Sequence, residues 1–132
     1  DGRITDSQGR TVDFKNTIII MTSNLGSEYI LENVENKDEL VMNELKHTFK
    51  PEFINRIDEI VPFNKFTEED INKIIIKEAN KCYKKYNSEN IISLDMINRI
   101  IKESNYEEYG VRKLCKAVRK EIENQIVCNI FS

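Results

Sequence analysis

The sequence predicts an α/β fold in two parts, a sheet-based part over residues 1–65 and a small, mainly helical part over residues 66–132. The unbroken apolar run "IIIM" at residues 18–21 is typical of a strand that is covered on both faces. From Thr67 onward, apolar residues recur at helical spacing behind helix-capping residues. We place the boundary near residues 63–67, where the first pattern gives way to the second.

The composition is that of a soluble globular chain of 132 residues, with 39% hydrophobic and 33% charged residues. Lys and Arg total 20 against 23 Asp and Glu, for a formal net charge of −3, and the two signs are interspersed, which argues against nucleic-acid binding. No apolar run approaches the roughly 20 residues that span a bilayer, and the N-terminus lacks the features of a signal peptide. We therefore expect no nucleic-acid partner, no membrane insertion and an intracellular location.

Cysteine and histidine usage excludes several kinds of site. Cys82, Cys115 and Cys128 are widely spaced and each lies in an apolar helical pattern, so we expect core thiols in a reducing compartment and no zinc site. His47, the one histidine in the sequence, is expected on a helix surface. No metal site and no Ser–His or Cys–His catalysis is predicted.

The first part opens with a hairpin and a strand. Residues 3–14 predict the hairpin, with Gly9 supplying the positive φ of its turn. The strand over residues 16–24 follows directly.

A helix and a second strand are expected after it. The helix is predicted by Leu40, Val41, Leu45 and Phe49, and Pro51 stops or bends it. "EIVPF", residues 59–63, predicts a brief strand at an edge of the sheet, because it contains Pro62.

Three helices are expected in the second part. Thr67 caps the first, whose acidic first turn complements the helix dipole. Ser93 caps the second, and "IISL" at residues 91–94 is a candidate short strand. The third begins at about Gly110 and carries an apolar stripe of Val111, Leu114, Cys115, Val118, Ile122, Ile126 and Ile130.

Three polar positions suggest ligand contacts. The strand at residues 16–24 ends in "TSN", and ligands of open α/β sheets lie beyond the carboxyl ends of strands. Alternatively, the strand simply ends there and reaches the protein surface. Arg56 lies among apolar residues, where it either presents its planar fork to a phosphate or pairs with Asp58 or Glu59. Arg112 falls in the first turn of a helix, where a positive charge opposes the dipole unless an anion is near.

The chain by itself is not expected to bind ATP tightly or to hydrolyse it. No glycine begins the G-x-x-x-x-G-K-[ST] motif, so the loop that cradles phosphates is absent from the sequence. Asp58 and Glu59 precede an apolar segment, whereas the acidic residues of an ATPase motif follow one.

Taken in order, "DGRITDSQGRTVDFKN", a strand ending in "TSN", "FKPEFINRIDE" and "YGVRKL" resemble the C-terminal part of the second AAA+ module of Clp-type protein unfoldases. The resemblance runs from Asp1 to about Ile130. It implies the end of an AAA+ large subdomain (residues 1–65) followed by a small helical lid with short strands (residues 66–132). It also implies that the chain begins just after the Walker B strand of a larger hexameric motor.

The resemblance assigns roles residue by residue. Asn24 matches sensor 1, which orients the attacking water, and Arg56 matches the arginine finger that acts on ATP of the neighbouring subunit. Arg112 matches sensor 2, which couples the phosphates to the lid. Ile71 and Ile74 are candidates for the wall of the adenine site, with core packing as the alternative. ATP and Mg²⁺ are the implied cofactors of the full-length protein, with none bound tightly to this chain.

The sequence departs from the family pattern at four positions. The family commonly has arginine at Lys50, alanine at Val111, proline at Lys113 and arginine at Lys116. Lys50 and Lys116 keep the positive charge of arginine but cannot make the two parallel hydrogen bonds of a guanidinium group. Val111 and Lys113 change the turn beside sensor 2.

Details of the motifs favour a ClpB-like disaggregase. "TDSQGRTV", "SNLGSEYIL" and "EIENQI" resemble that group, and residues 26–49 lack the aliphatic-Gly-Phe or -Leu loop of Clp motors that dock on a peptidase. The expected partners are unfolded or aggregated polypeptides, further copies of the chain in a hexamer, and other chaperones. The alternatives are the unfoldase of a ClpP-type peptidase and a non-hydrolysing interaction module derived from a lid.

Overall fold

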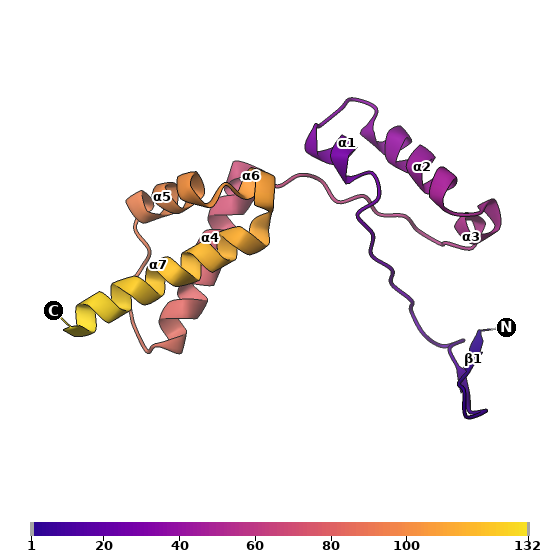
Figure 1. The fold of residues 1–132 in the computed structure, drawn as a ribbon, viewed down its shortest axis with the longest axis horizontal. Helices are drawn as coiled ribbons and strands as arrows, with labels where there is room; N and C mark the ends of the chain where they lie inside the picture. Colours follow the sequence, from indigo (N-terminus) through magenta and orange to yellow (C-terminus); the bar gives the residue numbers. More distant parts are fainter. Residues whose placement is uncertain (1, 132) are drawn as a thin grey trace. The chain divides into compact units, whose positions relative to one another are not determined.

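A computed structural model describes residues 2–131 of the chain, so Asp1 and Ser132, the outer bounds of the two expected parts, lie outside the described residues. The chain divides into two compact units, residues 1–64 (unit 1) and residues 65–132 (unit 2). Figure 1 shows strands in unit 1 alone and helices in both units.

Unit 1 begins with the predicted hairpin, which the structure confirms. Strands β1 (Arg3–Thr5) and β2 (Thr11–Asp13) are antiparallel, and Ile4 lies opposite Val12. The carboxylate of Asp6 accepts hydrogen bonds from the backbone N–H groups of Gln8 and Arg10, each at 2.9 Å. Gly9 has φ +80°, the left-handed conformation that the turn requires.

The predicted strand at residues 16–24 is wrong for this structure. The segment is irregular, and Ile18 is 90% exposed. A strand forms only where a neighbouring strand takes up its backbone N–H and C=O groups. The sheet in residues 2–131 has two strands, β1 and β2, and both pair with each other alone.

Three helices follow in unit 1. The predicted helix is confirmed as α2 (Lys37–Thr48), and the short α1 (Ser27–Leu31) and α3 (Pro51–Asn55) flank it. Pro51 does end α2, and it also starts α3, because proline is tolerated in a first turn. His47 lies on the exposed face of α2, as predicted.

Unit 1 has little core. Val41 is the one buried hydrophobic side chain among residues 2–64. Gly26 (φ +72°) lies against it, and a Cβ at Gly26 would come within 2.8 Å of Val41 Cγ2. The rings of Phe49 and Phe53 pack at a centroid distance of 5.0 Å. The predicted edge strand at residues 59–63 is also wrong: it is irregular and has no strand beside it.

Unit 2 contains α4 (Glu68–Lys85), α5 (Leu94–Ser104), α6 (Tyr106–Tyr109) and α7 (Val111–Phe131). The three predicted helices are α4, α5 and α7, and the short α6 was not foreseen. Thr67 and Asp70 form a reciprocal capping box at the start of α4, and Ser93 caps α5 by accepting from Met96 N–H at 3.2 Å.

One hydrophobic core holds unit 2 together. Its buried members are Ile71, Ile75, Ala79, Cys82, Tyr83, Ile92, Ile97, Ile100, Leu114, Val118 and Ile122. Most of the stripe predicted for the third helix therefore faces inward. The predicted short strand at residues 91–94 is wrong, because Ile92 enters this core from an irregular segment and no strand lies within residues 65–131.

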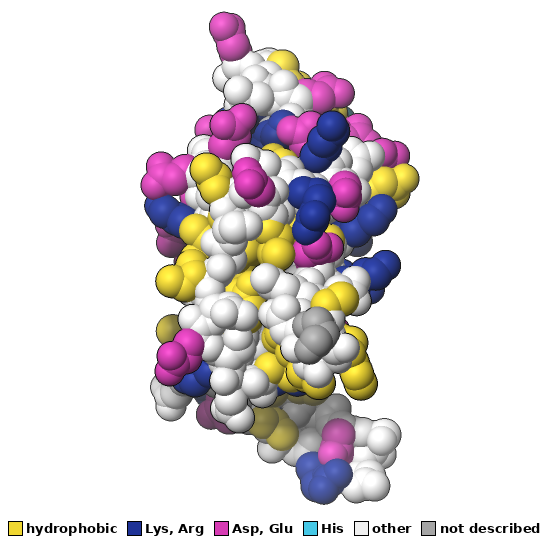
Figure 2. Space-filling view, turned by 90° about the vertical axis from the view of Figure 1, so that its left-hand side faces the viewer, with side chains coloured by type: hydrophobic (Ala, Val, Ile, Leu, Met, Phe, Trp, Pro, Cys, Tyr) yellow, Lys and Arg dark blue, Asp and Glu magenta, His cyan; other side chains and the backbone are white. Residues whose placement is uncertain are grey.

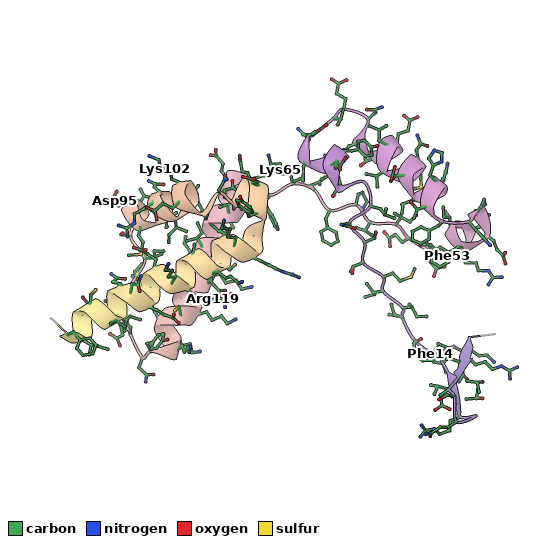
Figure 3. All side chains as sticks on the ribbon, in the orientation of Figure 1. Phe14, Phe53, Lys65, Asp95, Lys102 and Arg119 are labelled. Carbon is green, nitrogen blue, oxygen red and sulfur yellow. The ribbon has the colours of Figure 1, made fainter. Side chains whose placement is uncertain are left out.

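Polar contacts tie the helices of unit 2 to one another. Tyr83 Oη donates to Gln125 Oε1 at 2.8 Å, joining α4 to α7. Arg119, which is labelled on α7 in Figure 3, pairs through Nε with Glu78 Oε1 on α4 at 2.9 Å. Figure 2 shows side chains of both charges interspersed with apolar ones on the face that it draws.

The three thiols differ in their surroundings. Cys82 is buried and Cys115 is half-buried, and burial raises the pKa of both thiols. Cys128 is exposed, so its prediction as a core thiol is wrong. It lies near the C-terminal end of α7, beyond the buried part of that helix, which ends at Ile122.

Candidate functional site

Asn24 lies in the turn that leads from the irregular segment into α1. Its carbonyl accepts from Ser27 N–H at 3.2 Å, and Ser23 Oγ accepts from Leu25 N–H at 3.1 Å. The side chain of Asn24 is exposed. The backbone of the turn is therefore held by hydrogen bonds, while the amide group of Asn24 remains available to a ligand.

Arg56 occupies the C-cap position of α3, with φ −90° and ψ −9°. Its side chain is 78% exposed and donates through Nη2 to Glu52 Oε1 at 3.1 Å. The predicted local partners were Asp58 or Glu59, and the ion pair goes to Glu52 instead because Glu52 lies one helical turn earlier on the same helix. A guanidinium has five N–H donors, so most of the fork stays open.

Arg112 is the second residue of α7, as the sequence predicts. It is exposed, and it has no ion pair with any residue between 2 and 131. The N–H groups of a first helical turn have no partner within the helix, and the dipole makes that end positive. Together these features suit contact with an anion such as phosphate.

Ile71 and Ile74 both lie on α4, and their packing differs. Ile71 is 1% exposed and belongs to the core, whereas Ile74 is partly buried and packs against it. Core packing accounts for Ile71 in this structure. Contact with adenine stays a prediction for both residues, and Ile74 has the larger free surface for it.

The candidate residues are divided between the two units. Asn24 and Arg56 belong to unit 1, and Arg112, Ile71 and Ile74 belong to unit 2. Within the described residues of unit 1, no hydrogen bond or ion pair links Asn24 to Arg56.

The donor groups present fit phosphate rather than a metal ion. Arg56 and Arg112 offer exposed guanidinium groups, which match phosphate oxygens in geometry. Across the described part of the chain, no group of three His, Cys, Asp or Glu residues gathers as a metal site would require. No described helix has the length and apolar character needed to cross a membrane.

A cation–π contact beside Arg112 was not predicted from the sequence. Lys113 Nζ lies 3.6 Å from the centroid of the Tyr109 ring. The available signal was an aromatic residue followed by lysine four positions later, a spacing that brings side chains together on a helix. The glycine between them obscured it, because Gly110 separates two helices.

The family to which the chain belongs follows from comparison with known proteins. Residues 1–60 match the family model of the AAA domain (Cdc48 subfamily), and residues 66–132 match that of the C-terminal, D2-small domain of ClpB protein. The chain therefore belongs to the Clp-type AAA+ family.

Two relatives illustrate the similarity. The chain is 39% identical, over 142 residues, to the ATP-dependent Clp protease ATP-binding subunit ClpC of Staphylococcus aureus (strain USA300). It is 37% identical to the protein of the same name from Staphylococcus epidermidis (strain ATCC 12228 / FDA PCI 1200). Each match covers 96% of this chain and 17% of the relative, so the chain spans a small part of these proteins.

Proposed function

We propose that this chain supplies three nucleotide-responsive residues of an ATP-driven protein unfoldase. In this proposal residues 1–65 are the end of an AAA+ large subdomain and residues 66–132 are its lid. The complete protein forms a hexamer that uses ATP and Mg²⁺ to thread unfolded or aggregated polypeptides through a central pore, inside the cell and together with other chaperones. The chain alone is inactive, because its sequence has no phosphate-cradling loop.

The state of Arg56 is the observation that carries the proposal. An arginine finger must reach a phosphate outside its own subunit, so its guanidinium has to be exposed and held loosely. Arg56 is 78% exposed, and among residues 2–131 its guanidinium pairs with Glu52, an exposed carboxylate on the same short helix. Glu52 accepts one hydrogen bond from the fork, whereas phosphate carries more charge than a carboxylate and can accept two parallel N–H bonds, so it can displace Glu52.

Asn24 and Arg112 have complementary parts in this scheme. Asn24 orients the water that attacks the terminal phosphate, a task that an exposed amide on a hydrogen-bonded turn can perform. Arg112 contacts the phosphates from unit 2 and couples their presence to the movement of the lid. Bound ATP supplies the phosphoryl group, and Mg²⁺ neutralises its developing charge.

Within the family, one observation favours a disaggregase over a partner of a peptidase. Residues 26–49 contain no aliphatic-Gly-Phe or -Leu loop of the kind expected for peptidase docking.

The second candidate function is that of an unfoldase that feeds a ClpP-type peptidase. It is favoured by the relatives themselves, which are named as ATP-binding subunits of the ATP-dependent Clp protease. A pull-down of the full-length protein with the peptidase of the same cell separates the two candidates. ATP-dependent capture supports the peptidase partner, and its absence, with a ClpC protein captured in parallel, supports the disaggregase.

A mixing experiment tests the proposed arginine finger. Full-length subunits carrying Arg56→Ala are mixed with subunits disabled in their own Walker A loop, and ATP turnover of rings of verified composition is measured. Each variant has what the other lacks, so an adjacent pair in the correct order should recover hydrolysis at one interface.

A tethered dimer of the two variants, built in both orders, supplies the control. Because three such dimers close into a ring in which the two variants alternate, whichever comes first, activity above that of both parents supports action on the neighbouring subunit. Activity no higher than that of either parent, in both orders, rules it out. A non-hydrolysing interaction module is excluded as soon as a Walker A motif is found in the coding sequence upstream of Asp1.

A further inference from the structure

A side-chain contact crosses the junction between α6 and α7. α6 ends at Tyr109 and α7 begins at Val111, so Gly110 alone joins them. Gly110 has φ +82°, and its N–H donates to the carbonyl of Tyr106 at 2.7 Å. Lys113 Nζ lies 3.6 Å from the centroid of the Tyr109 ring, which links the last residue of α6 to the first turn of α7.

Residues on both sides of this junction are anchored in the core of unit 2. Tyr106 and Val111 are half-buried and pack against the core, and Leu114 is fully buried. Tyr109, in contrast, is 56% exposed. The cation–π contact therefore lies on the surface. The backbone beneath it, from Tyr106 to Leu114, is anchored in the core at both ends and contains Arg112.

The first turn of α7 carries an excess of positive charge, and the contact with Tyr109 partners one of its two cations. Arg112 and Lys113 are adjacent cations, the turn contains no acidic residue, and the helix dipole opposes both charges. The face of an aromatic ring is electron-rich, so the Tyr109 ring provides Lys113 with a partner. Arg112 has no ion pair within residues 2–131, which leaves its guanidinium as the open cation of the turn.

We propose that Tyr109 and Lys113 form a clasp that fixes the first turn of α7 and thereby positions Arg112 for contact with phosphate. The inference rests on the proposed role of Arg112 in nucleotide response. The clasp restrains the first turn of α7 through a side-chain contact, because Lys113 Nζ lies over the ring of Tyr109. Tyr109 and Lys113 are positioning residues in this scheme.

The clasp itself is tested by NMR on the 132-residue chain. Ring currents should shift the Lys113 ε-methylene protons upfield in the wild type and in Tyr109→Phe, but not in Tyr109→Leu. Amide exchange at Gly110 should accelerate about two- to five-fold in Tyr109→Leu and in Lys113→Met, and exchange at Lys113 should accelerate by the same factor in Tyr109→Leu, the range that an exposed cation–π contact provides.

The chain offers a matched control for these variants. Lys85 Nζ lies 5.1 Å from the centroid of the Tyr86 ring at the end of α4, away from the junction. Tyr86→Leu should leave exchange at Gly110 and Lys113 unchanged. An unshifted Lys113 signal in the wild type, or equal exchange in Tyr109→Leu and the wild type, overturns the clasp.

The link to Arg112 is tested in the full-length hexamer. Tyr109→Leu and Lys113→Met should raise the KM for ATP about two- to five-fold, again from the strength of an exposed cation–π contact. Tyr109→Phe should behave as the wild type. In an Arg112→Ala background, the same two substitutions should change the KM no further.

The outcomes separate the clasp from the function on which it rests. If Arg112→Ala leaves KM and turnover unchanged, the proposed role of Arg112 fails, whatever the NMR result. If Arg112→Ala has an effect but the clasp substitutions act equally in both backgrounds, Arg112 is not the residue that they position, and the inference is overturned.

Discussion

Glu52 and Arg56 lie one helical turn apart on α3, with Arg56 Nη2 donating to Glu52 Oε1 at 3.1 Å. Both side chains are 78% exposed, and pairs of this kind at i,i+4 spacing contribute about 0.3–0.5 kcal/mol. The pairing therefore cannot be the reason for a large effect of substituting Arg56. Glu52 instead supplies the control that separates a local structural role from a catalytic one.

Arg56→Ala in the full-length hexamer should abolish most ATP hydrolysis, because in-trans arginine fingers contribute on the order of 10³–10⁵ in rate. Arg56→Lys should rescue poorly, since an ammonium cannot make the two-pronged contact. Glu52→Ala removes the local partner alone and should change turnover by about two-fold at most, the equivalent of an exposed i,i+4 pair. Equal losses in Glu52→Ala and Arg56→Ala, measured as kcat, would assign Arg56 to local structure.

Asn24→Ala should lower ATP turnover while nucleotide affinity stays largely intact, because positioning of the water matters mainly in the transition state. The measurement is kcat beside the Kd of a fluorescent ATP analogue, with the other ATPase module silenced. Ser23→Ala, which removes the hydroxyl that accepts from Leu25 N–H, shows what loosening the turn does by itself. Unchanged turnover in Asn24→Ala would remove Asn24 from the mechanism.

The helices of unit 2 could be predicted because their signals are local. Thr67 and Ser93 cap α4 and α5 within three residues of their own positions, and the spacing of Leu114, Val118 and Ile122 marks the inner face of α7. The short helices α1, α3 and α6 were missed, since four or five residues are too few to show a periodic pattern.

Strands depend on residues far away in the sequence, and this is where prediction from sequence was wrong. The run at residues 18–21 has the composition of a buried strand, yet composition does not supply the neighbouring strand that takes up its hydrogen bonds. Only the hairpin, whose two strands are joined by a short turn, carries both partners within one local pattern.

The candidate site shows the same division. The placement of Arg112 in a first helical turn could be predicted, because caps and helix starts are local. The choice of Glu52 over Asp58 or Glu59 as the partner of Arg56 could not, since it required knowing that α3 begins at Pro51. The contact between Lys113 and Tyr109 depends on the conformation of Gly110, which the sequence does not specify.

Ile122→Val should lower the free energy of unfolding of unit 2 by about 0.5–1.5 kcal/mol, because a buried methylene is lost and a small cavity is left. Ile122 is fully buried on α7. Ile130→Val, the same change on the same helix at a side chain that is 69% exposed, is the matched control and should have little effect. Denaturant unfolding of the 132-residue chain, followed by circular dichroism, measures both; equal effects would place Ile122 outside the core.

Stability should fall in acid through Asp70. Its carboxylate accepts from the backbone N–H and the hydroxyl of Thr67 at 2.9 and 2.8 Å, and the backbone hydrogen bond in particular lowers the pKa of Asp70 below its ordinary value of 3.8. A carboxyl group whose pKa is lower in the folded state stabilises the fold above the unfolded pKa, and the stabilisation is lost as the pH falls through the folded pKa.

The comparison of wild type with Asp70→Asn measures this contribution. The difference in unfolding free energy between them should be constant near neutral pH and should narrow as the pH falls through and below 3.8. A difference that persists unchanged in strong acid would mean that the charge of Asp70 contributes nothing to the cap.

The irregular segment at residues 17–22, "TIIIMT", bears on the tendency of the chain to aggregate. It has β-branched residues, no charge and no proline, the features of segments that stack into cross-β fibrils. Its apolar side chains Ile18, Ile19, Ile20 and Met21 are 60–90% exposed. A chain that is fully folded in unit 2 therefore still exposes an uncharged segment with the features of a template for fibril growth.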